Sequence, residues 1–137
     1  MRAPTYQECV ECIGAIFAQA AANKGLPISA AIVDGHGDLV AFGRMDGAAM
    51  RTVNLSRDKA YSAIYMSRDT NEFRDMMAHF GFELNWFANP RLTALPGGVR
   101  IRDDQVTVGA IGISGRTADE DHELARFGFE RLRPKLS

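Results

Sequence analysis

Residues 28–44, ISAAIVDGHGDLVAFGR, hold two apolar runs separated by a turn that contains two glycines. The first run, residues 28–34, is typical of a largely buried strand, and residues 39–44 return as its partner. Gly35 and Gly37 adopt positive φ at low cost, which favours a tight turn between the two runs. This hairpin is therefore the first predicted part of the sheet.

The remaining strands are expected in the second half of the chain. Residues 99–102 and 106–114 flank a turn, and the run 106–114, VTVGAIGIS, is nearly all apolar or small, as in a central strand covered on both faces. We expect a further short strand at residues 92–95. Because hairpins rather than crossovers link most of these strands, the sheet should be mainly antiparallel.

Helices are expected to cover this sheet. Helical spacing and end signals place them at about residues 6–23, 48–66, 70–80 and 117–133. Capping-box spacing marks three of the N-termini, in the pairs Thr5 and Glu8, Asp69 and Glu72, and Thr117 and Glu120. The pattern predicts one α/β (α+β) domain over residues 1–137, with about five strands and flanking helices.

Composition excludes several classes of protein. The chain has 137 residues with 16 basic and 17 acidic side chains, a net charge of −1, so it lacks the field that attracts nucleic acid or an anionic membrane. No apolar run is as long as a membrane span, and the N-terminus lacks the order of a secretory signal. We expect a cytoplasmic protein with reduced thiols, a small-molecule ligand, and no nucleic-acid or membrane partner.

The cysteines and histidines give weak signals. Cys9 and Cys12 have the spacing of a redox pair or half a metal site, but no second pair accompanies them, which favours ordinary helix cysteines and no metal site. The three histidines are scattered without paired spacing. His36 lies at the hairpin tip, where it would line a ligand mouth, whereas His122 is expected to be exposed on the last helix, and His79 falls in the third.

Glycines and one lysine are stronger candidates for a site. Gly97 and Gly98 precede one strand, and Gly109, Gly112 and Gly115 interrupt or end the last. Repeated glycine in strands indicates close approach of another backbone or of a ligand, and a Gly-Gly turn also cradles a carboxylate or phosphate. The two interpretations carry equal weight here.

Lys59 lies in an otherwise apolar stretch of the second helix. A solvated helix charge is the commoner outcome for such a lysine, and pairing with an anionic ligand is the alternative. Arg44 and Asp46 bracket the end of the second strand, as a pocket rim or as a surface ion pair.

Several motifs together resemble the GlcG/HbpS family, which is related to the C-terminal domain of PduO-type corrinoid adenosyltransferases. They are residues 31–34 (AIVD), 37–42 (GDLVAF), 44–47 (RMDG), 58–63 (DKAYSA), 95–99 (LPGGV), 108–115 (VGAIGISG) and 119–121 (DED). Each is weak alone, but their order covers nearly the whole chain. The resemblance implies an antiparallel sheet flanked by helices in profilin-like layering, homo-oligomers, and a ligand surface near Lys59, the turn at 96–98 and Gly115. Known members bind haem, and His36 stands where the family usually has a small residue.

The leading hypothesis is a binding protein for haem or a related planar anionic ligand. The proposed ligand-binding residues are Lys59, Pro96, Gly97, Gly98, Gly115, Arg44 and Phe42. His36 or His79 would be the axial ligand of the iron, and Trp86 and Phe87 would pack on the ring.

Two other hypotheses stay open. The chain would instead be a cofactor-independent isomerase or lyase acting on a small organic acid, with Lys59, Asp34 and His36 as the catalytic candidates. The third hypothesis is an accessory subunit whose apolar surface serves assembly alone.

Overall fold

Four antiparallel strands form the sheet, in the order β2-β1-β4-β3, in a computed structural model that describes residues 1–137. The strands are β1 (Ser29–Asp34), β2 (Leu39–Arg44), β3 (Gly98–Arg102) and β4 (Thr107–Ser114). The predicted hairpin is the β1–β2 pair, and the mainly antiparallel order is confirmed. β4, the run that we expected to be central, pairs with both β1 and β3.

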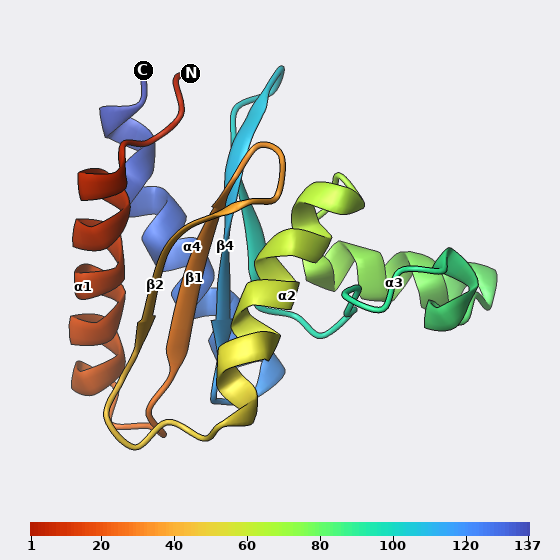
Figure 1. The fold of residues 1–137 in the computed structure, drawn as a ribbon, viewed down its shortest axis with the longest axis horizontal. Coiled ribbons are helices and arrows are strands. Elements are labelled where there is room, and N and C mark those ends of the chain that lie inside the picture. Colours follow the sequence, from red (N-terminus) through yellow and green to blue (C-terminus); the bar gives the residue numbers. More distant parts are fainter.

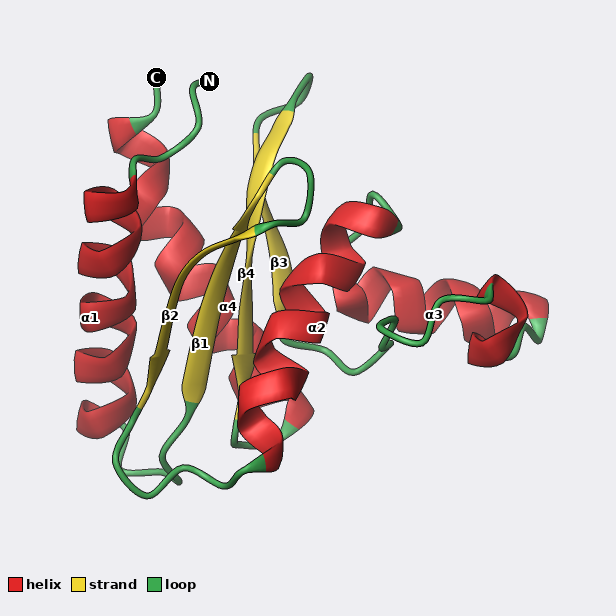
Figure 2. Cartoon of the chain, in the orientation of Figure 1, coloured by secondary structure: helices red, strands yellow, loops and turns green.

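Helices lie on both faces of the sheet. They are α1 (Tyr6–Ala22), α2 (Arg51–Tyr65), α3 (Thr70–Phe80) and α4 (Ala118–Leu132), with short 3-10 turns η1 (Leu84–Phe87) and η2 (Arg133–Lys135). α1 and α4 pack together on one face, and α2 lies alone on the other (Figure 1; Figure 2). No helix is both long enough and apolar enough to span a bilayer.

The three predicted capping boxes form at the N-termini of α1, α3 and α4. In α1, the Thr5 hydroxyl accepts a hydrogen bond from the Glu8 amide at 3.1 Å, and the Glu8 carboxylate accepts one from the Thr5 amide at 2.9 Å. Each box satisfies amides that the first helical turn leaves without partners, which fixes where the helix begins.

The expected fifth strand at residues 92–95 is wrong, because the N-terminus of α3 occupies the outer edge of β3. The Gly98 amide donates to Thr70 Oγ1 at 2.9 Å, and the Arg100 amide donates to Asp69 Oδ1 at 2.9 Å. Both amides face away from β4, where a fifth strand would have to pair. The segment 92–95 instead bonds to α2, with the Thr93 amide donating to Ser62 Oγ at 2.9 Å.

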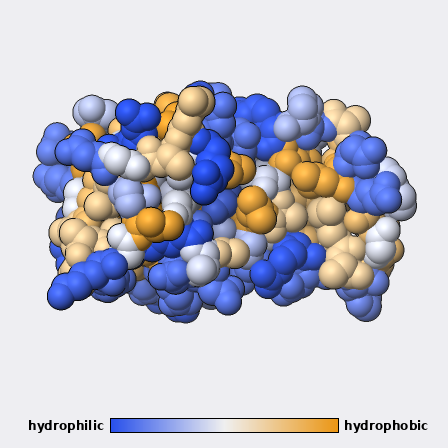
Figure 3. Space-filling view, turned by 90° about the horizontal axis from the view of Figure 1, so that it is seen from below, coloured by the Kyte–Doolittle hydropathy of each residue, from blue (hydrophilic) through white to orange (hydrophobic).

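α3 and η1 form an arm that extends away from the body of the domain (Figure 1). α3 touches mainly α2 and β3, and Phe73 is its one large buried side chain. Beyond it, Phe80, Phe82 and Trp86 are 60%, 40% and 61% exposed. Figure 3 shows apolar side chains gathered at this end of the molecule, on the right.

Candidate functional site

A small recess opens between the first half of α2 and the loop that joins β4 to α4. Its volume is about 190 Å³. Ten residues line it: Arg51, Thr52, Leu55, Lys59, Leu95, Ser114, Gly115, Arg116, Ala118 and Asp121. Lys59 and Gly115, two of the predicted ligand-binding residues, therefore lie at one place.

Lys59 is buried, which corrects the expectation of a solvated helix charge. Its side chain is 3% exposed, and its ammonium donates to the Ile113 carbonyl at 2.8 Å and to Asp121 Oδ2 at 3.1 Å. Asp121 is equally buried, and its second oxygen accepts the Arg116 amide at 3.0 Å. A buried charge is tolerated only when it is paired in this way, so the pair joins α2 to the start of α4.

Burial dominates the electrostatics of this pair. Desolvation lowers the pKa of Lys59, and the Asp121 carboxylate opposes that shift by favouring the charged ammonium. Desolvation likewise raises the pKa of Asp121, against the Lys59 charge and the backbone amides of Arg116 and Gly115. The Lys59 ammonium is thus already matched in charge by a protein carboxylate.

The glycines beside Lys59 are sites of close packing. A Cβ on Gly97 would stand 2.6 Å from the Ile113 carbonyl oxygen and 2.9 Å from Lys59 Nζ. A Cβ on Gly98 would overlap the Lys59 backbone carbonyl, and one on Gly115 would stand 2.6 Å from the Pro27 carbonyl oxygen. Backbone and side chain of the same protein fill the space that these glycines leave, and Gly97 and Gly115 also need positive φ of 129° and 143°.

The other predicted ligand-binding residues lie around this centre at different distances. Pro96 is buried in the turn beneath Lys59, outside the lining of the recess. Arg44 shares a row of the sheet with Ser29 and Ser114, two strands from the recess, and Phe42, further along β2, is 37% exposed. Lys59 and the glycines therefore lie together, whereas Arg44 and Phe42 of β2 lie away from the recess.

The candidate catalytic residues do not meet. Asp34 pairs in register with Gly109, whereas Lys59 reaches the carbonyl of Ile113, four residues along β4. At about 3.3 Å per residue this separates them by about 13 Å along the sheet. The Asp34 carboxylate instead orders its own turn, accepting the backbone amide of His36 at 2.8 Å.

A second candidate surface lies on the arm. His79 is exposed and meets Phe80 edge to face, with ring centroids 4.7 Å apart. Phe80 stacks on Phe82 at 5.3 Å, and Phe82 lies 6.0 Å from Trp86. A hollow of about 600 Å³ adjoins η1 on the same arm, lined by Glu83, Leu84, Asn85, Ala88, Asn89, Pro90 and Leu92. Phe87 also belongs to this cluster, because it contacts the Phe82 ring at 6.3 Å.

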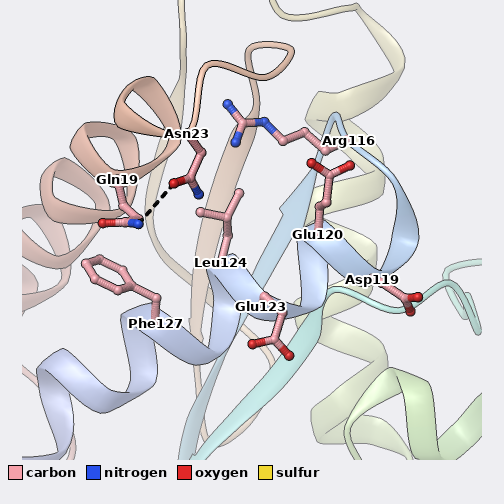
Figure 4. Close-up of a pocket in the computed structure, with 8 residues that line it drawn as sticks. All are labelled: Gln19, Asn23, Arg116, Asp119, Glu120, Glu123, Leu124 and Phe127. Carbon is pink, nitrogen blue, oxygen red and sulfur yellow. Dashed lines mark hydrogen bonds between the residues drawn. The ribbon is translucent and has the colours of Figure 1, made fainter.

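A third hollow, of about 440 Å³, lies between the end of α1 and α4 (Figure 4). No pattern in the sequence indicated it. Asp119, Glu120 and Glu123 give it an acidic wall, and Arg116 stands at its edge. The Arg116 guanidinium is held there by the carbonyls of Ala20 and Leu26, the second at 2.8 Å.

The cysteines are ordinary core residues of α1. Both are buried, and the Cys12 thiol donates to the Gly128 carbonyl at 3.4 Å. Burial raises the pKa of Cys9 to about 11 and that of Cys12 to about 12. His122 is half-buried rather than exposed, and its Nδ1 is a buried atom without a hydrogen-bond partner. No cluster of three metal-ligating side chains occurs.

The recess residues that the sequence did not indicate as site residues include Arg51, Ser114 and Asp121. Asp121 was visible only as part of an acidic run before the last helix, and its pairing with Lys59 joins residues 62 positions apart. Ser114 was expected at the end of a strand, and no sequence pattern singled out Arg51. No local pattern in the sequence connects the three.

Comparison with known proteins gives consistent matches. Residues 5–130 match the family model described as haem degrading protein HbpS-like. Protein GlcG of Escherichia coli K12 is 31% identical over 108 residues, which cover 79% of each chain. A double mutant of HbpS from Streptomyces reticuli superposes with a TM-score of 0.83 at 26% identity, over 96% of this chain and 88% of that one. A structure of a PduOC–haem complex gives a TM-score of 0.85 at 24% identity, over 94% of each chain.

Proposed function

Because the chain belongs to the HbpS-like family of haem-degrading proteins, we propose that it binds haem or a closely related planar anionic ligand. The family description names haem, and the fold is shared with a protein whose structure is a haem complex. The remaining question is which surface of this chain takes the ring.

Size favours the arm over the Lys59 recess. Ligand pockets usually enclose about 300–1,000 Å³, and the recess holds about 190 Å³. Its ammonium is also neutralised by Asp121. The hollow on the arm is about 600 Å³, and the arm also carries the exposed rings of Phe80, Phe82 and Trp86. A tetrapyrrole therefore suits the arm.

The observation that carries this proposal is the position of His79 beside exposed aromatic rings. Its imidazole and the Phe80 ring meet at an interplanar angle of 79°, and Phe82 and Trp86 continue the aromatic surface. A neutral imidazole is a common axial ligand of haem iron, and aromatic rings pack well on a porphyrin. When bound, haem would supply the iron, the His79 imidazole would hold that iron, and the aromatic side chains of the arm would pack on the ring.

We also propose that the chain forms a homo-oligomer that closes this site. Bound ligands of this size usually bury about 70–90% of their surface. The arm stands clear of its own domain, so it covers one face of a flat ring (Figure 1). A second copy placed against the arm would cover the other face.

Haemin titration tests the proposal. The wild-type protein should shift the Soret band, and His79→Ala should lose or strongly weaken that shift. His36→Ala is the matched control, because His36 is also exposed but lies in the β1–β2 turn. Trp86→Ala should weaken binding by roughly two- to twelvefold, the value of an aromatic contact.

Several outcomes would contradict the proposal. No Soret shift with the wild-type protein would remove haem as the ligand. A shift that survives His79→Ala would exclude the arm, and loss with His36→Ala alone would move the axial ligand to the hairpin. Sedimentation velocity with and without haemin checks the oligomer, and a monomer that binds haemin fully would contradict the two-copy site.

A further inference from the structure

Some of the polar side chains that line the Lys59 recess form no hydrogen bond or ion pair within the protein. The Lys59–Asp121 pair at its floor is balanced in charge. The Arg116 guanidinium is turned toward the carbonyl of Ala20, in α1, and that of Leu26, in the segment after α1 (Figure 4). Of the three basic residues that line the recess, Arg51 is the one whose charged group has neither a carboxylate nor a carbonyl partner.

Arg51 is free to bind a ligand. It is exposed at the first position of α2, and none of the ion pairs of the protein includes it. The nearby acidic residues Asp119 and Glu120 line the groove on the other side of Arg116, not the recess. A guanidinium with no carboxylate opposite it is a strong two-point donor for an anion.

Ser114 is the second unused group. It is 5% exposed, and its hydroxyl has no hydrogen-bond partner within the protein, although it lines the recess. Ser29, which pairs with Ser114 on the neighbouring strand β1, does have a partner: its Oγ forms a hydrogen bond with Thr52 Oγ1 at 2.8 Å. His122 Nδ1 is the one fully enclosed side-chain nitrogen or oxygen without a partner, so the Ser114 hydroxyl is not fully enclosed. Ser114 lines the recess, and we infer that its hydroxyl faces that space.

Apolar side chains complete the lining. Leu55 of α2 and Leu95, which is 49% exposed, stand on the same recess. Liquid water takes about 30 Å³ per molecule, so 190 Å³ accommodates about six groups of that size. The recess thus combines one cation, one hydroxyl and an apolar wall at the scale of a very small molecule.

We propose that this recess is a second ligand site, for a short organic carboxylate of three or four carbon atoms. The Arg51 guanidinium donates two hydrogen bonds to the carboxylate, the Ser114 hydroxyl donates a third, and Leu55 and Leu95 pack on the carbon chain. The site is independent of haem, because the recess and the arm are lined by different residues.

Calorimetric titration with propionate and butyrate, at constant ionic strength, tests this site. A ligand of this size should bind with a dissociation constant on the order of 1 mM. Arg51→Gln should weaken binding by about ten- to hundredfold, and Ser114→Ala by about two- to tenfold. Arg57→Gln is the matched control, since Arg57 is on α2 but outside the recess.

Three further ligands test the size and charge selectivity of the recess. Octanoate, too long for the recess, and butylamine, of opposite charge, should not bind. Binding of inorganic phosphate as tight as that of butyrate would overturn the assignment to a carboxylate with a carbon chain. Equal affinity of Arg51→Gln and Arg57→Gln, or no heat with any short carboxylate, would overturn the site itself.

The experiments distinguish a failure of the haem proposal from a failure of the carboxylate proposal. Haemin titration of Arg51→Gln should match that of the wild-type protein, and His79→Ala should bind butyrate normally. Both substituted side chains are exposed, so circular dichroism is expected to show an unchanged fold. Loss of butyrate binding in His79→Ala would contradict two separate sites.

Discussion

Replacing Lys59 by methionine should strongly destabilise the fold. Methionine keeps most of the volume of the side chain but removes its charge, which leaves the Asp121 carboxylate buried with backbone donors alone. Ile113 also loses the hydrogen bond that its carbonyl accepts at 2.8 Å. Breaking a buried pair by removing one partner costs about 3–5 kcal/mol.

That cost is a large part of the stability of a domain, about 5–15 kcal/mol. The melting temperature of Lys59→Met should therefore fall by about 10–20 °C. Asp121→Asn should also destabilise, and the double variant should be no less stable than Lys59→Met. The cycle then gives a coupling free energy of about 2 kcal/mol or more.

Urea unfolding, followed by circular dichroism, measures all three variants. Arg74→Met is the control, because Arg74 and Asp75 form an ion pair whose side chains are 49% and 70% exposed, and such pairs contribute about 0–1 kcal/mol. A Lys59→Met variant within 1 kcal/mol of the wild-type protein, or additive single effects, would refute the assignment of Lys59 to a buried structural pair.

Three further predictions concern packing and protonation. Gly112→Ala should destabilise by at least about 2 kcal/mol in urea unfolding, because its Cβ would overlap the backbone of α2; wild-type stability would contradict this. Cys9 and Cys12 should resist alkylation at pH 8 until urea unfolds the protein, and rapid labelling of the native protein would contradict their burial. The free energy of unfolding should also fall as pH rises above about 9, because the pKa values of the folded thiols are about 11 and 12, so that only the unfolded thiols lose their protons there. Hydrogen bonds from Arg2 and the backbone lower the pKa of Glu8 to about 2, so its contribution, present above about 4.5, should be lost as pH falls toward 2; NMR titration of the Glu8 carboxyl measures that midpoint.

Local patterns predicted the secondary structure well because they depend on neighbouring residues. The capping boxes join residues three positions apart, and the β1–β2 hairpin needs only its own turn. The error at residues 92–95 has a non-local cause. Asp69 and Thr70 occupy the edge of β3 through hydrogen bonds that link residues 28 and 31 positions apart.

The site was predictable only in outline. The family resemblance implied a ligand surface near Lys59 and Gly115, and the structure brings these two residues together in the recess. Burial of Lys59 could not be predicted, because periodicity puts it at the edge of an apolar face and its carboxylate partner comes from another helix. Ser114 could not be predicted either, because only the folded structure shows that its hydroxyl has no hydrogen-bond partner.

The two borders of the sheet differ, and this limits how copies of the chain can join. The border at β3 is occupied by α3, whereas β2 has no neighbour on its outer side. Strand addition between copies is thus restricted to β2 against β2, across a twofold axis. In such a dimer the two outer edges of the joined sheet are both β3 strands, and each is covered by α3. Strand addition therefore stops at two chains and cannot continue into a fibril.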